Sequence, residues 1–154
     1  MQASRSVGKW VSVLYRYTQS YLKKKLEPYN LGAGQLPILL LLFQKENVRQ
    51  GDLAVQLQID KTSLARTISK LEANGYLRRN KDDQDYRAYR ISLTPRAKNF
   101  KDKLLPILKN WTSILMHNFT PAERDQFIAF LSKAAENAEQ ELKGDGSDTY
   151  GSFN

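Results

Sequence analysis

One face of the segment from Lys61 to Asn74 consists of small, hydroxylic and basic side chains. If the segment is a helix with about 100° per residue, Leu64, Ile68 and Leu71 cluster within about 40° of one direction. The opposite face contains Thr62, Arg66, Ser69 and Ala73, with Lys70 beside them. Small residues let a helix approach the floor of a DNA major groove, and the planar fork of arginine matches O6 and N7 of guanine. The spacing therefore predicts a helix that packs on one face and reads bases with the other.

A helix that merely exposes a polar face to water has the same pattern, so the surroundings decide between the two interpretations. Residues 61–96 carry nine basic and four acidic side chains, a local charge of +5 in a chain of formal net charge +8. A basic helix-turn-helix pattern followed by a hairpin is typical of domains that bind nucleic acid. These features favour double-stranded DNA as the partner.

Two short helices joined by a tight turn are predicted to hold this face. The apolar residues of the stretch 50–60 fit a two-turn helix and a turn. Asp60 is suited to cap the second helix, and Gly75 can end it in the left-handed conformation. The two helices together predict a helix-turn-helix.

A β-hairpin is predicted directly after the second helix. Aromatic and β-branched side chains appear in residues 76–81 and 87–93, with partial alternation across a polar loop. Asp82 and Asp83 are expected to form the tip, because short polar side chains in turns bond their own backbone.

Helices are also predicted before the helix-turn-helix. Apolar residues recur at three- and four-residue steps from about residue 4 to 26, which indicates an amphipathic helix ended by Glu27 and Pro28. Pro37 suits the first turn of a short helix through Phe43. That short helix is apolar nearly all round, so we expect it to be buried.

Two further helices are predicted after the hairpin. Residues 94–95, a threonine and a proline, are typical of a helix start, and Pro106 should kink this helix or divide it in two. Thr120 and Glu123 have the spacing of a capping box that begins the last helix. Residues 144–154 are rich in Gly, Ser and Asp, and they are predicted to be disordered.

The predicted fold class is mainly α with a small β-hairpin wing: a winged helix-turn-helix with N- and C-terminal dimerisation helices. The outer helices carry more apolar surface than one small module can cover, which indicates that a second chain packs against them. The predicted domains are 1–30 for the N-terminal dimerisation helix, 31–97 for the DNA-binding domain, 98–143 for the C-terminal dimerisation helices and 144–154 for the tail.

The residue types that an enzyme or a metal site needs are scarce. The chain has no cysteine, and its single histidine, His117, has no partner with which to form a catalytic or metal-binding group. No catalysis, metal or cofactor is therefore expected. The longest apolar run has eight residues, against roughly 20 for a membrane-spanning helix, and the N-terminus lacks the apolar core of a signal peptide. A cytoplasmic protein without membrane contact is predicted.

Residues 31–97 resemble the winged helix-turn-helix of the MarR family of bacterial and archaeal transcriptional regulators. The most specific part is a D-x-R followed by L-T, here residues 85–87 and 93–94. It lies downstream of a recognition helix of the DK(T/S) type that ends in L-E-x-x-G, here residues 71–75. Three positions depart from the family pattern: Arg49 stands where a serine or threonine cap is common, Gln58 where the turn commonly has glycine, and Ala97 where glycine is frequent after the wing.

The resemblance implies that Arg87 enters the minor groove from the wing tip and that Asp85 holds the Arg87 side chain by an ion pair. The recognition-helix residues expected to contact DNA are Lys61, Thr62, Ser63, Arg66, Ser69 and Lys70. The corresponding wing residues are Arg78, Arg79, Lys81, Asp85, Arg87 and Arg90. For the other four basic residues of the wing, contact with phosphates and contact with water alone both remain open.

The resemblance also implies a repressor that binds a pseudo-palindromic operator as a homodimer and is released by a small aromatic or phenolic ligand. The candidate ligand-pocket residues are Trp10, Arg16, Tyr17, Tyr21, Phe43 and Trp111. Ordinary packing in the core or the dimer is the alternative for each of them. The alternative for the whole protein is a basic winged-helix module that binds nucleic acid without sequence preference or docks another protein.

Overall fold

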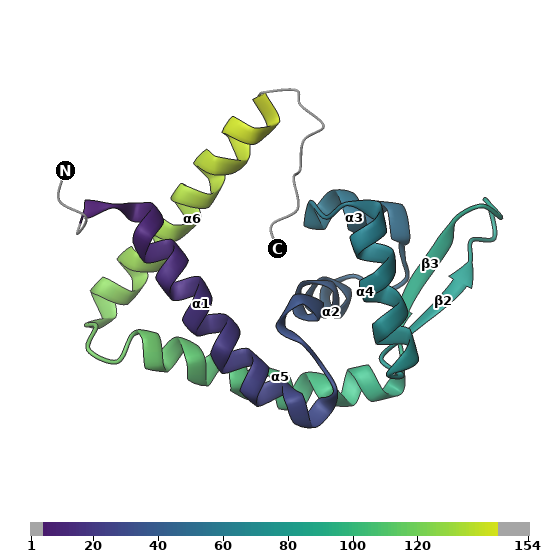
Figure 1. The fold of residues 1–154 in the computed structure, drawn as a ribbon, viewed down its shortest axis with the longest axis horizontal. Coiled ribbons are helices and arrows are strands. Elements are labelled where there is room, and N and C mark those ends of the chain that lie inside the picture. The colour runs from purple at the N-terminus through teal and green to yellow at the C-terminus, as the bar shows by residue number, and fades with distance from the viewer. Residues whose placement is uncertain (1–4, 145–154) are drawn as a thin grey trace. The chain divides into compact units, whose positions relative to one another are not determined.

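The structure is a computed structural model that describes residues 5–144. Its elements in chain order are α1 (Val7–Leu26), the short 3-10 helices η2 (Glu27–Tyr29) and η3 (Ala33–Gln35), α2 (Leu36–Gln44), β1 (Val48–Arg49), α3 (Gln50–Leu57), α4 (Lys61–Ala73), β2 (Leu77–Lys81), β3 (Tyr89–Leu93), α5 (Pro95–Leu115) and α6 (Pro121–Gly144) (Figure 1). The chain forms two compact units, and the boundary between Trp111 and Thr112 lies within α5. The mainly α fold with a small sheet is confirmed. Beyond Gly144, the predicted disordered tail lies outside the described residues.

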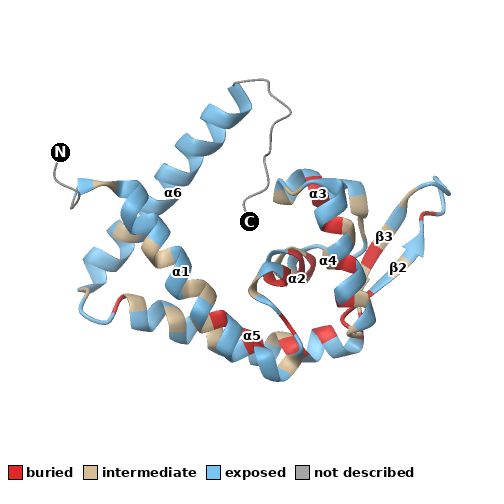
Figure 2. Cartoon of the chain, in the orientation of Figure 1, coloured by how far each residue is buried: buried red, intermediate tan, exposed pale blue. Residues whose placement is uncertain are grey.

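The core of the first unit is centred on α2, as its sequence predicted. Ile38, Leu39 and Leu42 are completely buried. Buried positions also gather on α4 and on the first half of α5 (Figure 2). Tyr76 is buried with its ring edge against Phe100, and its hydroxyl donates a hydrogen bond of 2.7 Å to a backbone carbonyl of η2. Burial of these apolar side chains is the main source of the unit's stability.

The sheet has three antiparallel strands in the order β1-β3-β2. The predicted hairpin is confirmed, with β2 and β3 paired from Leu77↔Leu93 to Lys81↔Tyr89. Strand β1 was not predicted, because two residues are too few to show an alternating pattern. Its register pairs Arg49 directly with Arg90.

Pro106 does not divide the long helix, and α5 is continuous from Pro95 to Leu115. A proline inside a helix removes the hydrogen bond to the carbonyl four residues earlier. Here Pro106 and Asp102 are both exposed, so water can reach the Asp102 carbonyl. This exposure explains why the helix tolerates the proline.

Thr94 joins the end of α4 to the start of α5. Its backbone N–H donates to Tyr76 O at 3.1 Å, and its hydroxyl donates to Gly75 O at 2.6 Å and Tyr76 O at 3.2 Å. The same hydroxyl accepts the N–H of Ala97 at 3.3 Å, as the predicted N-cap requires. Gly75 has the predicted left-handed conformation, with φ of +78°.

The second unit contains the end of α5 and the helix α6. The capping box is confirmed, since Thr120 N donates to Glu123 Oε2 at 2.8 Å and Glu123 N donates to Thr120 Oγ1 at 3.2 Å. No described residue of α6 is buried (Figure 2). Its apolar residues Phe130 and Leu131 are exposed. Across residues 5–144, no helix is long and apolar enough to cross a membrane.

Gln58 has φ of +53° and ψ of +43°, the left-handed conformation that glycine adopts at no steric cost. We expect Gln58→Gly to stabilise the folded protein by about 0.5–1 kcal/mol, because relief of the left-handed strain exceeds the added freedom of the unfolded chain. Urea unfolding followed by circular dichroism measures the change.

Gln56→Gly is the matched control, because Gln56 is exposed inside α3. There the same substitution should destabilise the helix by about 0.5–1 kcal/mol. Equal losses at residues 56 and 58 would contradict the prediction.

Candidate nucleic-acid interface

Helix α4 begins at a side-chain cap, as predicted. Asp60 Oδ1 accepts the backbone N–H of Ser63 at 2.8 Å. Hydrogen bonds from the hydroxyl and the N–H of Ser63 lower the pKa of Asp60 below its ordinary value. Asp60 therefore stays ionised at neutral pH, where its charge favours the positive N-terminal end of the helix.

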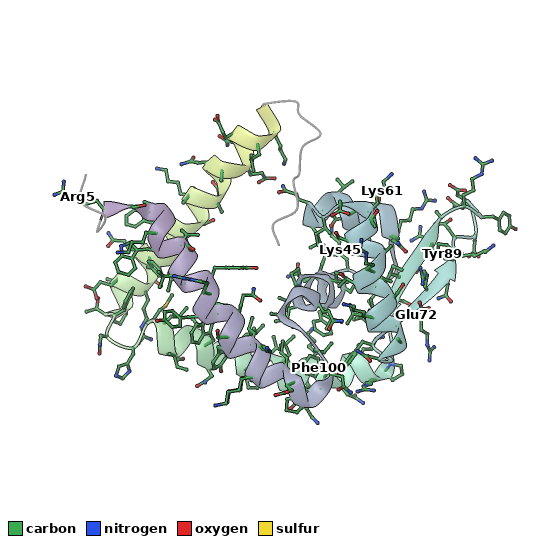
Figure 3. The ribbon with its side chains drawn as sticks, viewed as in Figure 1. Arg5, Lys45, Lys61, Glu72, Tyr89 and Phe100 are labelled. Atoms are coloured by element: carbon green, nitrogen blue, oxygen red, sulfur yellow. The ribbon has the colours of Figure 1, made fainter. Side chains whose placement is uncertain are left out.

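The two faces of α4 are divided as the sequence predicted. Leu64, Ile68 and Leu71 are 0–1% exposed and belong to the core. The candidate DNA-contacting residues of this helix are all exposed: Lys61, Thr62, Ser63, Arg66, Ser69 and Lys70. Figure 3 shows Lys61 at the start of the helix and Glu72 near its end. The structure thus leaves all six polar residues exposed to solvent.

Arg79 is held by protein partners in the wing. Its Nη2 donates to Glu72 Oε2 at 2.9 Å, and its guanidinium lies 5.5 Å from the centre of the Tyr89 ring. Figure 3 labels Glu72 on α4 and Tyr89 on the wing, the two elements that Arg79 connects. This contact fastens the wing to the recognition helix. Arg78 and Lys81 are exposed.

Asp82 is the carboxylate that organises the wing, and this differs from the sequence-based interpretation. As predicted for a turn residue, its Oδ1 accepts backbone N–H groups, from Gln84 at 2.8 Å and Asp85 at 3.2 Å. However, Asp82 is also only 1% exposed, and its Oδ2 accepts Nε–H of both Arg49 and Arg90 at 2.8 Å. A second arginine contact joins Arg49 Nη2 to Asp82 Oδ1 at 3.3 Å.

The ion pair expected between Asp85 and Arg87 does not occur within the described chain. Instead, Asp85 Oδ1 accepts the backbone N–H of Arg87 at 3.0 Å, and the Arg87 side chain is exposed. Asp85 bonds the backbone N–H of Arg87 more readily than the Arg87 guanidinium, because the backbone contact does not require the long arginine side chain to be ordered. The DNA contact of Arg87 stays a prediction.

The electrostatics of the wing follow from these contacts. The N–H of Gln84 and the guanidinium of Arg49 lower the pKa of Asp82 from 3.8 to about 2. Asp82 in turn raises the pKa of Arg49. Because the pKa of Asp82 is depressed on folding, its ionised form stabilises the folded state above about pH 4, and this contribution is lost as the pH falls toward 2.

Sequence reasoning missed the role of Arg49 and did not predict the protein partners of Arg90. Arg49 precedes α3, where a serine or threonine would cap the helix, and its side chain makes no cap hydrogen bond. Arg90, which was predicted to face DNA, donates Nη1–H to the carbonyl of Asn47 at 2.7 Å. The available signal was the departure at Arg49, where an arginine stands in place of the common serine or threonine cap.

The candidate ligand residues divide into packed and exposed groups. Tyr21 and Trp111 stack with ring centres 4.6 Å apart, and Trp111 Nε1 donates to Thr18 Oγ1 at 3.0 Å. Trp10 and Tyr17 are more than half exposed. Among residues 5–144, hollows of about 520, 500, 370 and 290 Å³ are lined by residues other than these candidates.

The smallest of these hollows, of about 290 Å³, lies between α3, the start of α4 and the wing. Its lining residues are Gln50, Gly51, Ala54, Lys61, Leu64, Arg87, Ala88 and Tyr89. Lys61 and Arg87 therefore approach one concave surface from the recognition helix and from the wing tip.

Comparison with known proteins gives the same architecture. The model of the MarR family matches residues 31–89. The HTH-type transcriptional regulator BilQ of Clostridioides difficile (strain CD3) is 26% identical over 111 residues, covering 72% of this chain and 75% of that protein. A crystal structure of a putative MarR family transcriptional regulator from Listeria monocytogenes complexed with 26mer DNA has a TM-score of 0.81, with 95% and 99% of the chains covered. At 21% identity, that likeness shows the fold alone.

A crystal structure of a MarR transcriptional regulator from Methanosarcina mazei Go1 is more similar in sequence. It is 38% identical, with a TM-score of 0.83, and the alignment covers 87% of this chain and 96% of that one. This identity over nearly the whole length of the relative, on a shared winged helix, shows that the chain belongs to the MarR family of transcriptional regulators.

Proposed function

We propose that this regulator is a homodimeric repressor that binds a pseudo-palindromic DNA site and is released by a small ligand. The observation that supports DNA binding best is the hollow shared by Lys61 and Arg87. Two cationic side chains from different elements, on one concave surface, can bind a DNA phosphate. The exposed face of α4 can contact base edges in the major groove. The Listeria monocytogenes protein of the same fold is complexed with 26mer DNA.

The homodimer part of the proposal is supported by exposed apolar side chains on the outer helices. They are Val7, Trp10, Val11, Tyr15 and Tyr17 on α1, and Ile128, Phe130, Leu131 and Leu142 on α6. Large exposed apolar patches mark interaction sites. We therefore assign residues 1–30 and 98–143 to dimerisation. In such a dimer, two recognition helices about 34 Å apart can read successive major grooves on one face of DNA.

Release by a ligand requires a molecule that binds two forms of the dimer with different affinity. We propose an aromatic or phenolic anion near Tyr21 and Trp111, where stacked rings lie on α1 and α5. The ligand would favour a dimer whose recognition helices are spaced wrongly for DNA.

Selection of bound sequences from a random pool of duplex DNA tests the proposal most directly. We expect enrichment of one palindromic site, bound at least about 10³-fold more tightly than unrelated DNA. Equal, salt-dependent affinity for every duplex would instead identify a non-specific nucleic-acid-binding module.

Arg87→Ala should weaken binding to the selected DNA and lower the salt slope of log K by about 0.9, because one positive charge is lost from the DNA interface. Folding should be unaffected, since the Arg87 side chain is exposed. Fluorescence anisotropy at several salt concentrations measures both quantities. Arg124→Ala, at an exposed position of α6, serves as the control and should leave the slope unchanged. An unchanged affinity in the Arg87 variant would remove the wing tip from the interface.

A further inference from the structure

The register of the sheet creates an electrostatic problem in the wing. Arg49 of β1 and Arg90 of β3 lie directly opposite each other. Like charges at opposite positions of an antiparallel pair are destabilising. Asp82 resolves the conflict, because a single oxygen of its buried carboxylate accepts Nε–H of both arginines at 2.8 Å.

The other oxygen of Asp82 holds the wing-tip loop, residues 82–88. It accepts the N–H groups of Gln84 and Asp85. The loop is closed by Asp82 N donating to Ala88 O at 3.0 Å and by Ala88 N donating to Asp85 O at 2.9 Å. One carboxylate thus connects the start of α3, the strand β3 and the backbone of the loop.

Arg87 depends on this loop for its position. Its backbone N–H is bonded to Asp85, whereas no hydrogen bond or ion pair within residues 5–144 holds its side chain. The neighbouring Tyr86 is 77% exposed, so side-chain packing does not fix the tip either. The backbone, and therefore the carboxylate that organises it, determines where the Arg87 guanidinium is presented.

We propose that Asp82 is a positioning residue for DNA binding: by joining Arg49 and Arg90 to the wing-tip backbone, it places Arg87 relative to the recognition helix. This inference rests on the proposed function of Arg87 in DNA binding. It assigns to Asp82 the part that the family pattern gives to Asp85. It also gives Arg49, at the N-terminal end of α3, a structural partner in the wing.

A double-mutant cycle between Asp82→Asn and Arg87→Ala tests the inference, with affinity for the selected DNA measured by fluorescence anisotropy. Asp82→Asn should weaken binding about tenfold when Arg87 is present, and less than about twofold when Arg87 is alanine. Equal losses in both backgrounds would show that Asp82 acts only on overall stability, and would overturn the proposal. Urea unfolding of each variant, at the temperature of the binding assay, shows whether all four proteins are folded under the conditions of that assay.

Asp83→Asn is the matched control, because it removes the same charge from the adjacent, exposed residue. It should tighten DNA binding slightly in both backgrounds, through reduced repulsion of phosphates. If Asp82→Asn does not fold, Asp82→Glu keeps the charge between the arginines while displacing the oxygen that binds Gln84 and Asp85. The proposal is supported if Asp82→Glu weakens binding when Arg87 is present and has no effect when Arg87 is alanine. It is overturned if Asp82→Glu binds DNA with wild-type affinity.

The cycle separates the failure of this inference from failure of the proposed function. If the wild-type protein binds no DNA specifically, the proposed function and the positioning role of Asp82 are both overturned. If it binds one palindrome tightly and Arg87→Ala changes nothing, DNA binding stands and the positioning role of Asp82 is overturned.

Discussion

Leu131→Glu is expected to make the protein monomeric and to weaken its binding to a palindromic site by about 10²- to 10⁴-fold, because the second recognition helix would no longer be tethered to the first. Leu131 is 46% exposed on α6, a helix with no buried residue among those described. In the proposed dimer it would be covered by the partner, and a buried unpaired carboxylate is costly. Sedimentation at micromolar concentration measures the first effect, and anisotropy the second.

The control for this substitution is Gln140→Glu on the opposite side of the same helix, nine residues along the chain. At about 100° per residue, nine residues make two and a half turns, so Gln140 lies about 180° from Leu131 around the helix axis. Gln140→Glu should leave both the oligomeric state and the affinity unchanged. A Leu131→Glu protein that remains dimeric would remove this face of α6 from the interface.

Ile68→Ala should lower the free energy of unfolding by about 2–5 kcal/mol, the cost of deleting buried methyl groups and leaving a cavity. Ile68 is completely buried, and it lies on the face of α4 that holds the recognition helix against the core. Chemical denaturation followed by circular dichroism measures the loss. DNA binding should fall only as the folded fraction falls.

Ser69→Ala provides the contrast, since the next residue lies on the exposed face. We expect its stability to change by less than about 0.5 kcal/mol. Any loss of DNA affinity would then report a contact with the nucleic acid. If the two variants lost the same stability, the division of α4 into a core face and a DNA face would be wrong.

Local signals in the sequence were sufficient for most of the fold. Asp60, Gly75, Thr94 and Thr120 act through hydrogen bonds or backbone angles within a few residues, and all four have the predicted cap or turn geometry. The apolar face of α4 was equally predictable, because one periodicity defines it. These features depend little on the rest of the chain.

The organisation of the wing depends on contacts between distant residues, and the sequence could not supply it. Asp82 and Arg49 are 33 positions apart, and their contact requires the two-residue strand β1 to pair with β3. Of the wing residues expected to face DNA, Arg79 and Arg90 proved to be bound to protein carboxylates. A run of mixed charges shows that pairs are possible, but only the register of the strands selects which pairs form.

The junction at Thr94 has a mechanical consequence for any regulator built on this chain. The end of α4 and the start of α5 are joined through hydrogen bonds to one buried residue, although the whole wing separates the two helices along the chain. We therefore expect a displacement of the first turn of α5 to act on the C-terminal end of the recognition helix through these hydrogen bonds.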